Sequence, residues 1–133
     1  MHVTYEEKWQ RDHWRSFQMN YRSSPYFEFY EDDFKPFYHE EINSLVDFNL
    51  ALHDKIMELL QLEVPYERSN SYATDLAHGM DYRLAFPTKA SKEQNSVDVR
   101  YTQVFDDRNG FLNDLSIVDL LFNVGPQSTS FLR

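Results

Sequence analysis

Cysteine is absent from this chain of 133 residues, and glycine occurs only three times. The lack of cysteine excludes disulfide bonds, a thiolate nucleophile and zinc sites with cysteine ligands. Scarce glycine favours packed helices over a turn-rich β-sandwich. We find no run of 18 apolar residues and no basic segment followed by an apolar one, so we expect neither a membrane span nor a signal peptide. The cytoplasm is therefore the expected location.

Basic residues are also in short supply. Lysine and arginine number 13 against 22 acidic residues, which gives a net charge of −9 at pH 7. Nucleic acid and anionic lipid are bound by clustered cations, so we expect neither as a partner. The acidic stretch at residues 28–41 lacks the Asp-x-Asp-x-Asp-Gly loop of a divalent-cation site. We interpret it as a solvated helical face, with a cation site as the weaker alternative, and expect no metal and no cofactor.

What the chain has in abundance is aromatic side chains. They make up 17% of the residues, with 11 phenylalanines and 9 tyrosines, and hydrophobic residues reach 41%. This amount of apolar material is ordinary for one globular core. The composition therefore predicts that residues 1–133 form a single domain.

Three helices are predicted in the N-terminal half. Thr4 has capping-box spacing before a helix over residues 5–21, which contain no proline or glycine. Ser24 occupies the N-cap position of a second helix, which Pro36 interrupts or restarts. Residues 43–62 carry a wide apolar stripe with helical spacing. This half of the chain is thus expected to be helical throughout.

The C-terminal half is predicted to be mixed. Residues 97–105 alternate apolar and polar side chains, as a half-buried strand does. Ser116 and Asp119 have capping-box spacing before a short apolar run, and Gly125 ends that helix. The predicted fold class is α+β and mostly α-helical, with three N-terminal helices, a small β element near residues 97–105 and a short C-terminal helix.

Several segments occur in the order seen in one protein family. The longest is Gly-Phe-Leu-Asn-Asp-Leu-Ser-Ile-Val-Asp-Leu-Leu-Phe-Asn-Val-Gly-Pro at residues 110–126, and the others cover residues 9–16, 24–30, 47–49, 81–83 and 101–105. Together they resemble the WbqC-like family of bacterial proteins. The resemblance implies a role in surface-polysaccharide (O-antigen) biosynthesis. Thr102 and Asp114 depart from the family pattern, in which an aromatic residue and a proline are usual.

The same resemblance implies that part of the family's domain is missing. Family members usually have a substantial segment before the point where this chain begins, so residues 1–133 would be the C-terminal portion of a WbqC-like domain. Strand edges near Val3 and Val99 would then lack neighbours, and open edges invite pairing. We therefore expect the chain to bury apolar surface by forming a homo-oligomer.

His13 is the candidate catalytic residue. It lies with Gln10 on the aromatic face of the first predicted helix, between Trp9 and Phe17. Imidazole gains and loses a proton near neutral pH, which suits a general acid or base. Because an unpaired polar group in an apolar stripe is costly, we expect His13 to be largely buried with a side-chain partner. The alternative is a purely structural histidine, and Gln10 is a candidate for orienting a sugar.

Asp81, Arg83 and Lys89 are the candidates for binding phosphate. Arginine and lysine suit a phosphate group, and Asp81 could orient either a sugar hydroxyl or Arg83 itself. A surface salt bridge on a loop is the equally weighted alternative. Only the family resemblance gives this cluster its weight as a binding site.

Four further residues are candidates for binding a sugar. Tyr101 and Gln103 would project from the same face of the predicted strand, although Tyr101 could equally pack in the core. Asp119 and Asn123 lie one helical turn apart and could bind a ligand together, but a capping role for Asp119 is favoured. The chain has no second histidine to complete His-Glu-x-x-His and no Gly-x-Ser-x-Gly pattern.

The leading hypothesis is a transferase that modifies a nucleotide-linked sugar during surface-polysaccharide assembly. In it His13 moves the proton, the Asp81–Lys89 loop holds phosphate and Tyr101 helps to orient the sugar, all in one shared pocket. The alternative is a non-catalytic, aromatic-rich helical module that binds a glycan or a partner protein. Convergence of His13 and Arg83 on one site would favour the enzyme.

Overall fold

The computed structural model describes residues 1–75, 79–83, 99–113 and 115–132. The chain divides into two compact units. The first comprises Met1–Val64 and Asp98–Arg133, and the second comprises Pro65–Val97. Each unit is described by itself below.

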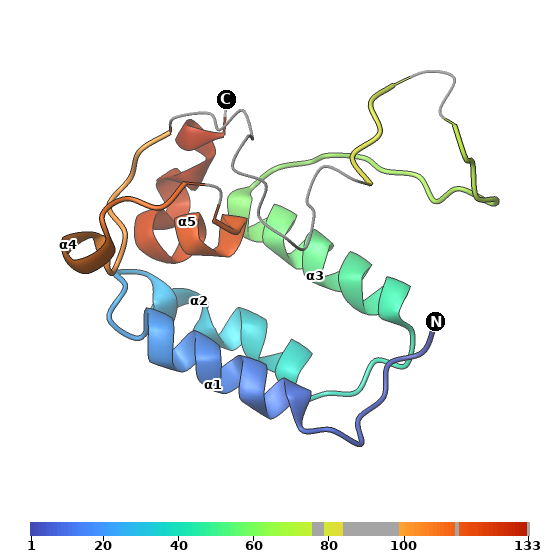
Figure 1. Cartoon of the computed structure of the whole chain (residues 1–133), viewed down its shortest axis with the longest axis horizontal. Coiled ribbons are helices and arrows are strands. Elements are labelled where there is room, and N and C mark those ends of the chain that lie inside the picture. Colours follow the sequence, from blue (N-terminus) through green and yellow to red (C-terminus); the bar gives the residue numbers. More distant parts are fainter. Residues whose placement is uncertain (76–78, 84–98, 114, 133) are drawn as a thin grey trace. The chain divides into compact units, whose positions relative to one another are not determined.

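Helices build the first unit (Figure 1). In chain order they are α1 (Trp9–Tyr21), α2 (Phe27–Phe34), the 3-10 helix η1 (Lys35–Tyr38), α3 (Leu45–Leu60), α4 (Asp106–Asn109), α5 (Ile117–Val124) and the 3-10 helix η2 (Gly125–Phe131). α1 and α2 both contact η1, α5 contacts α2, and η2 contacts α3. The helices expected in the N-terminal half and near the C-terminus are therefore present.

The expected strand at residues 97–105 is wrong, and with it the α+β class. Of the described residues in this range, 99–103 have no regular structure and 104–105 form a turn that leads into α4. Across the described parts of the chain, strand-like pairing is limited to one antiparallel bridge between His2 and Ser44. An alternating pattern makes a strand only where a neighbouring strand takes up its backbone hydrogen bonds. Here the Gln103 side chain bonds the backbone of Leu112 instead, and the fold is helical.

The helix boundaries show which capping signals work. Ser44 begins α3 by accepting a hydrogen bond from the Asp47 backbone at 3.3 Å. Thr4 does not begin α1, because its carbonyl accepts the indole N–H of Trp9 at 2.9 Å and the helix starts only at Trp9. Ser24 likewise does not begin α2; its hydroxyl donates to the Tyr21 carbonyl at 2.6 Å and closes the end of α1. A serine thus caps the start of α3, and another serine closes the end of α1.

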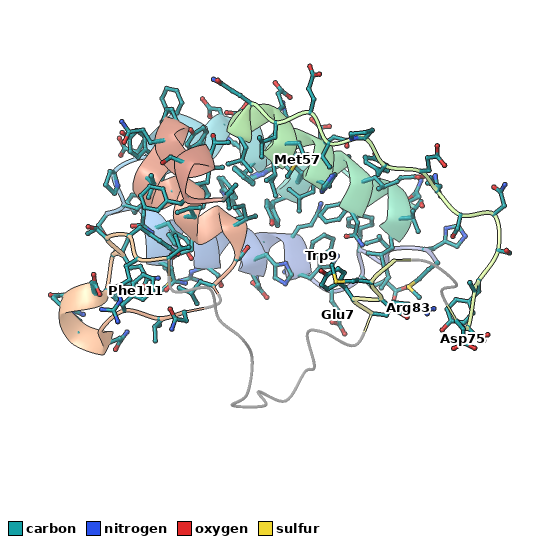
Figure 2. The ribbon with its side chains drawn as sticks, turned by 90° about the horizontal axis from the view of Figure 1, so that it is seen from above. Glu7, Trp9, Met57, Asp75, Arg83 and Phe111 are labelled. Atoms are coloured by element: carbon teal, nitrogen blue, oxygen red, sulfur yellow. The ribbon has the colours of Figure 1, made fainter. Side chains whose placement is uncertain are left out.

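The core of the first unit is aromatic. Phe122 on α5 is fully buried, and four other rings lie 5.0–5.9 Å from its ring, mostly edge-on: Phe17, Tyr21, Phe27 and Phe34. Such pairs contribute about 0.5–1.5 kcal/mol each beyond their buried area. Trp9 on α1 and Met57 on α3, both labelled in Figure 2, pack against this core. The aromatic abundance of the sequence therefore serves one tertiary cluster.

Gly125 joins α5 to η2 in a position that requires glycine. Its φ is +67°, and a Cβ there would lie 2.5 Å from the Tyr26 ring. The backbone N–H of Tyr26 donates to the Phe122 carbonyl at 2.9 Å, which holds the start of α2 against the end of α5. The predicted helix end is confirmed, and the structure adds a close approach that only the absence of a side chain allows.

Candidate functional site

A cavity of about 130 Å³ opens in the first unit, at the C-terminal end of α1. It is bounded by that helix end, by the segment that runs from residue 103 to 115, and by the first turn of α5. The residues that line it are Asn20, Tyr21, Gln103, Val104, Phe105, Asn109, Gly110, Leu112, Leu115 and Asp119. Apolar walls with a few polar groups are typical of a small-ligand site.

Asp119 supplies the negative charge of this cavity. Its side chain is only 5% exposed, and its Oδ2 accepts the hydroxyl proton of Tyr101 at 2.6 Å. Ser116 caps α5 by accepting from the Val118 N–H, so the favoured capping role of Asp119 is not seen. Asp119 instead lies in the first helical turn, where free N–H groups and the helix dipole stabilise an anion. The fold therefore keeps a carboxylate buried without a salt bridge partner among the cavity-lining residues.

Two tyrosines face this carboxylate. Burial, with the nearby Asp119, raises the pKa of Tyr101 to about 12. Burial and the same carboxylate raise the pKa of Tyr21 well above its ordinary value. Both hydroxyls consequently remain protonated at neutral pH, and that of Tyr101 donates a hydrogen bond to Asp119. Tyr101 is thus a positioning residue behind Asp119, and its ring packs edge-on against Phe111 at 5.5 Å.

Gln103 and Asn123 support the site rather than face a ligand. The Gln103 amide donates to the Leu112 carbonyl at 2.8 Å and accepts from the Leu112 N–H at 2.9 Å. This reciprocal pair closes the loop that forms one wall of the cavity. Asn123 donates to the backbone carbonyl of Asp119 at 2.8 Å and is itself buried. Both predicted residues are near the carboxylate, with their amides largely occupied by backbone groups.

His13 lies at a second hollow, of about 200 Å³, that adjoins the cavity. Ser16, Phe17, Asn20 and Tyr21 complete its lining, and the last two also line the first cavity. His13 is exposed, so the prediction of a largely buried histidine is wrong. The next residue, Trp14, takes the buried position on α1, and the imidazole lies edge-on to the partly buried Trp9 ring at 5.3 Å. Within the described residues we find no side-chain hydrogen bond to His13.

Gln10 lines neither hollow and bonds the backbone of another segment. Its amide donates to the carbonyls of Phe37 at 3.2 Å and Glu40 at 2.7 Å. These bonds fasten α1 to the end of η1. The polar group predicted inside the aromatic stripe is therefore satisfied by the backbone of a neighbouring segment.

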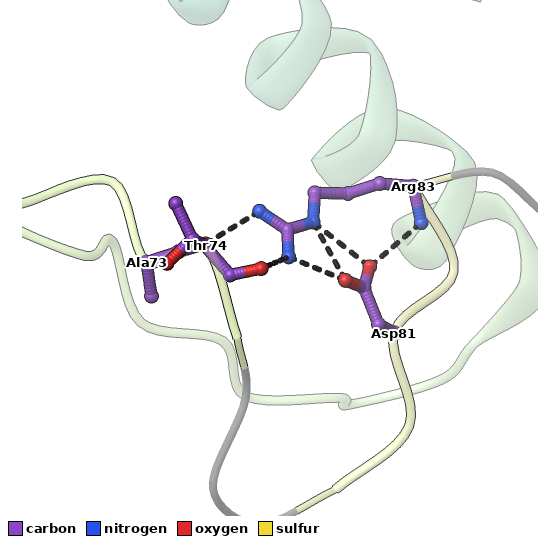
Figure 3. A network of polar contacts seen from close by, with 4 residues as sticks. All are labelled: Ala73, Thr74, Asp81 and Arg83. Carbon is purple, nitrogen blue, oxygen red and sulfur yellow. Dashed lines mark hydrogen bonds and ion pairs between the residues drawn. The ribbon is translucent and has the colours of Figure 1, made fainter.

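The second unit contains Asp81 and Arg83, which bind each other (Figure 3). The Arg83 guanidinium donates to both carboxylate oxygens of Asp81 and to the carbonyls of Ala73 at 2.6 Å and Thr74 at 3.2 Å. It also lies 5.1 Å from the centre of the Tyr72 ring. The hydrogen bonds from Arg83 lower the pKa of Asp81 to about 2. This is the loop salt bridge that the sequence offered as the alternative.

The shared pocket of His13 and Arg83 stays a prediction. The two residues belong to different units, each of which is described on its own. Lys89 lies outside the described residues. What the structure does bring together, within the first unit, is Gln103 with Asp119 in one cavity and His13 in the hollow beside it.

Several lining residues were missed by sequence reasoning. Asn20 and Tyr21 join the two hollows. Asn20 lies seven residues after His13 and so on the same helical face, a signal that could have found it. Leu112 and Leu115 reach the cavity from an irregular segment, where no periodicity indicates which way a side chain points.

The described part of the chain has neither a cluster of metal ligands nor a helix suited to a membrane. No group of three or more histidine, aspartate or glutamate side chains there could hold a metal ion. No helix among these residues has both the length and the apolar character to cross a membrane.

Comparison with known proteins gives two matches. Residues 1–96 match the model described as the WbqC-like protein family, a range that ends before the similar segment at residues 110–126. The chain is also 30% identical over 154 aligned positions to a Mycobacterium tuberculosis protein that carries the name Uncharacterized protein Rv1507c. That alignment covers 94% of this chain and 64% of the relative, so the chain spans less than two thirds of the relative's length. No solved structure matches the chain significantly.

Proposed function

The chain belongs to the WbqC-like protein family, and from this premise we propose that it acts in the assembly of a bacterial surface polysaccharide such as O-antigen. The proposed activity is that of a transferase that modifies a nucleotide-linked sugar. A cytoplasmic location and a sugar-nucleotide ligand are parts of the same proposal.

One observation carries the proposal: a buried carboxylate lines a cavity that also offers aromatic and amide groups. Asp119 can accept hydrogen bonds from sugar hydroxyls, because a carboxylate has about four acceptor positions and the Tyr101 hydroxyl occupies one. Tyr21 and Asn20 line the same space, although the Asn20 amide also donates to the Ser16 carbonyl at 2.8 Å. The cavity and the hollow share these two residues, and each is smaller than the roughly 300–1,000 Å³ typical of small-ligand pockets.

His13 is the proposed proton-transfer group. From the hollow beside the cavity it could take the proton of a sugar hydroxyl or amino group as that oxygen or nitrogen bonds the transferred group of a donor, whose leaving group departs with the electron pair of the broken bond. Its exposure is compatible with this role, since a catalytic histidine has to reach substrate.

The phosphate-binding role of Arg83 and Lys89 remains part of the proposal, but it has a cost. Arg83 would have to release the carbonyls of Ala73 and Thr74 or keep only part of its hydrogen bonds to Asp81. Gln10 would similarly have to leave two carbonyls in order to touch a sugar. We therefore assign the sugar to the Asp119 cavity first.

The non-catalytic alternative is favoured by the same bonding pattern. The polar groups of Gln10 and Arg83 are engaged internally, and His13 has no orienting side chain within the described residues. A module that binds a glycan needs no such orientation of an acid or base. Turnover is therefore the measurement that separates the two functions.

The test is a calorimetric titration of the chain with UDP-, GDP- and dTDP-linked sugars. Leu115→Trp should fill the cavity and abolish binding of the nucleotide sugar. Leu132→Trp is the matched control and should leave binding unchanged, because Leu132 does not line the cavity and the two leucines are similarly exposed, at 43% and 44%. His13→Ala should remove turnover of a ligand that binds and leave its affinity within a fewfold. Binding without turnover, unaffected by His13→Ala, would favour the binding module. Absence of binding to every nucleotide sugar would contradict the proposed activity.

Self-association is a separate part of the proposal. Met19 and Phe29 are large apolar side chains exposed on α1 and α2. A contact between copies would bury such surface. Sedimentation equilibrium over a range of concentrations tests this, and a monomer throughout would contradict it.

A further inference from the structure

We propose that the sugar recognised in the Asp119 cavity carries a protonated amino group. The inference rests on the proposed function and deepens it by naming a substrate class, the amino sugars. It follows from the charge inside the cavity and from the groups that surround that charge.

Among the described residues that line it, the cavity has one carboxylate and no matching cation. Asp119 is the acidic residue among its lining residues, and none of these is a lysine, arginine or histidine. Arg100 is the nearest basic residue along the chain to Tyr101, and its guanidinium lies over the Phe111 ring at 5.8 Å. A carboxylate that is only 5% exposed is poorly solvated by water, so its charge has to be balanced within the protein or by a ligand.

The first turn of α5 and the tyrosines balance that charge only in part, because a helix N-terminus supplies about half a positive charge. The Tyr101 hydroxyl donates to Oδ2 at 2.6 Å, but a neutral hydroxyl brings no compensating charge. A ligand hydroxyl would add a hydrogen bond but also brings no positive charge. An ammonium group supplies both the hydrogen bond and the charge, because it combines three donors with a positive charge in a small volume.

The walls of the cavity suit a cation as well. The aromatic side chains of Tyr21 and Phe105 line it, and aromatic faces attract ammonium groups. A diphosphate, by contrast, would be repelled by Asp119. The sugar end of a nucleotide sugar is therefore the end that enters this cavity, and the nucleotide remains outside it.

The experiment compares three probes that differ at one position of the sugar: UDP-glucosamine, UDP-N-acetylglucosamine and UDP-glucose. At mildly acidic pH, where the free amine is protonated, UDP-glucosamine should bind at least tenfold more tightly than the other two. Asp119→Asn retains the shape and one acceptor oxygen but removes the charge. It should reduce the affinity for UDP-glucosamine to that for UDP-glucose and change the latter by less than threefold. Asp107→Asn, on the exposed α4, is the matched control and should retain the preference.

The outcomes separate the two proposals. Equal binding of all three probes would overturn the amino-sugar inference and leave the proposed function standing. A preference for UDP-glucosamine that survives in Asp119→Asn would also overturn it, because another group would then bind the ammonium. Failure of all three probes to bind would overturn the inference, and the proposed function is contradicted only if the GDP- and dTDP-linked sugars also fail to bind.

A measurement on the unaltered chain covers the case in which Asp119→Asn does not fold. The backbone amide signals of the protein are recorded by NMR while free glucosamine is added. The signals of Tyr21, Leu115 and Asp119 should shift, and glucose at the same concentration should shift them less. Shifts confined to residues 65–83 would overturn the inference.

Discussion

Asp119 and Asp81 are two aspartates with opposite surroundings. Asp119, in the first unit, is 5% exposed, and its partner Tyr101 lies 18 residues away in the chain. The Asp81 side chain, in the second unit, is 40% exposed, and its partner Arg83 is two residues away. The first pair requires α5 and the segment before α4 to be packed together, whereas the second needs only a short stretch of chain. Changes near Asp119 should therefore affect the whole first unit, and changes near Asp81 should remain local.

The largest test of this contrast is Phe122→Ala against Tyr72→Ala. Phe122 is fully buried among four rings, so its truncation should lower the free energy of unfolding by about 3–5 kcal/mol. Tyr72 is 81% exposed beside Arg83, and its truncation should cost about 0.5 kcal/mol or less. Urea denaturation followed by tryptophan fluorescence measures both. Similar losses for the two variants would refute the contrast.

Gly125→Ala against Gly79→Ala comes next. Both glycines have positive φ, a conformation that costs other residues about 1–2 kcal/mol. Only at Gly125 would the new Cβ meet a neighbour, the Tyr26 ring at 2.5 Å, which should add about 1–3 kcal/mol. At Gly79 nothing lies within 4 Å of the new atom. Thermal unfolding should show a clearly larger loss for Gly125→Ala, and equal losses would mean that the close approach is unimportant.

Tyr101→Phe should have a smaller effect than either core change. It removes the hydroxyl that donates to buried Asp119, at a cost of about 1–3 kcal/mol. Tyr82→Phe, in the exposed second unit, is the control and should leave stability unchanged. Chemical denaturation of the three proteins at pH 8 gives the comparison. If Tyr82→Phe lost as much stability as Tyr101→Phe, the hydrogen bond from Tyr101 to Asp119 would not be the cause of the loss.

The same tyrosine should make the first unit sensitive to alkali. Because the pKa of Tyr101 is raised to about 12, its protonated hydroxyl contributes stability that is fully present below an ordinary pKa of about 10. That contribution is lost as the pH rises through about 12. An absorbance titration at the tyrosinate band should show one fewer late-titrating group in Tyr101→Phe.

Asp81→Asn should have the smallest effect. It breaks an exposed pair within one loop, so we expect no measurable change in global unfolding. The pKa of Asp81 is lowered to about 2, so the pair is intact above the ordinary carboxyl pKa and is lost as the pH falls through about 2. Carboxyl carbon NMR at decreasing pH checks this directly. A marked drop in global stability would show that the second unit is less local than we infer.

Much of the helical fold could be predicted from sequence. Ser116 and Gly125 begin and end α5 as their local chemistry indicates, because a cap or a positive φ involves only neighbours in the chain. Thr4 and Ser24 had equally good signals, yet their side chains or carbonyls bond other groups. The strand near residues 97–105 failed for a related reason, since a strand depends on a partner that no local pattern supplies.

The candidate site was predictable only in part. Gln103 and Asp119 were named from sequence and do line one cavity, and His13 lies at the hollow beside it. Their surroundings were not foreseen: His13 is exposed, and Gln103 is paired with Leu112. Burial is a property of what packs on a residue, so a helical position alone could not decide it.

The sequence by itself determined the family and the helical character of the N-terminal half. It also offered the Asp81–Arg83 pair as one of two interpretations, because that pair depends on residues close together in the chain. Only the tertiary structure decided that Tyr101 would meet Asp119, that Gly125 would face Tyr26, and that the end of α1 would border a cavity. These contacts join segments many residues apart. They exist because burying the aromatic rings around Phe122 stabilises one arrangement of helices, and that arrangement then sets which polar groups are brought together.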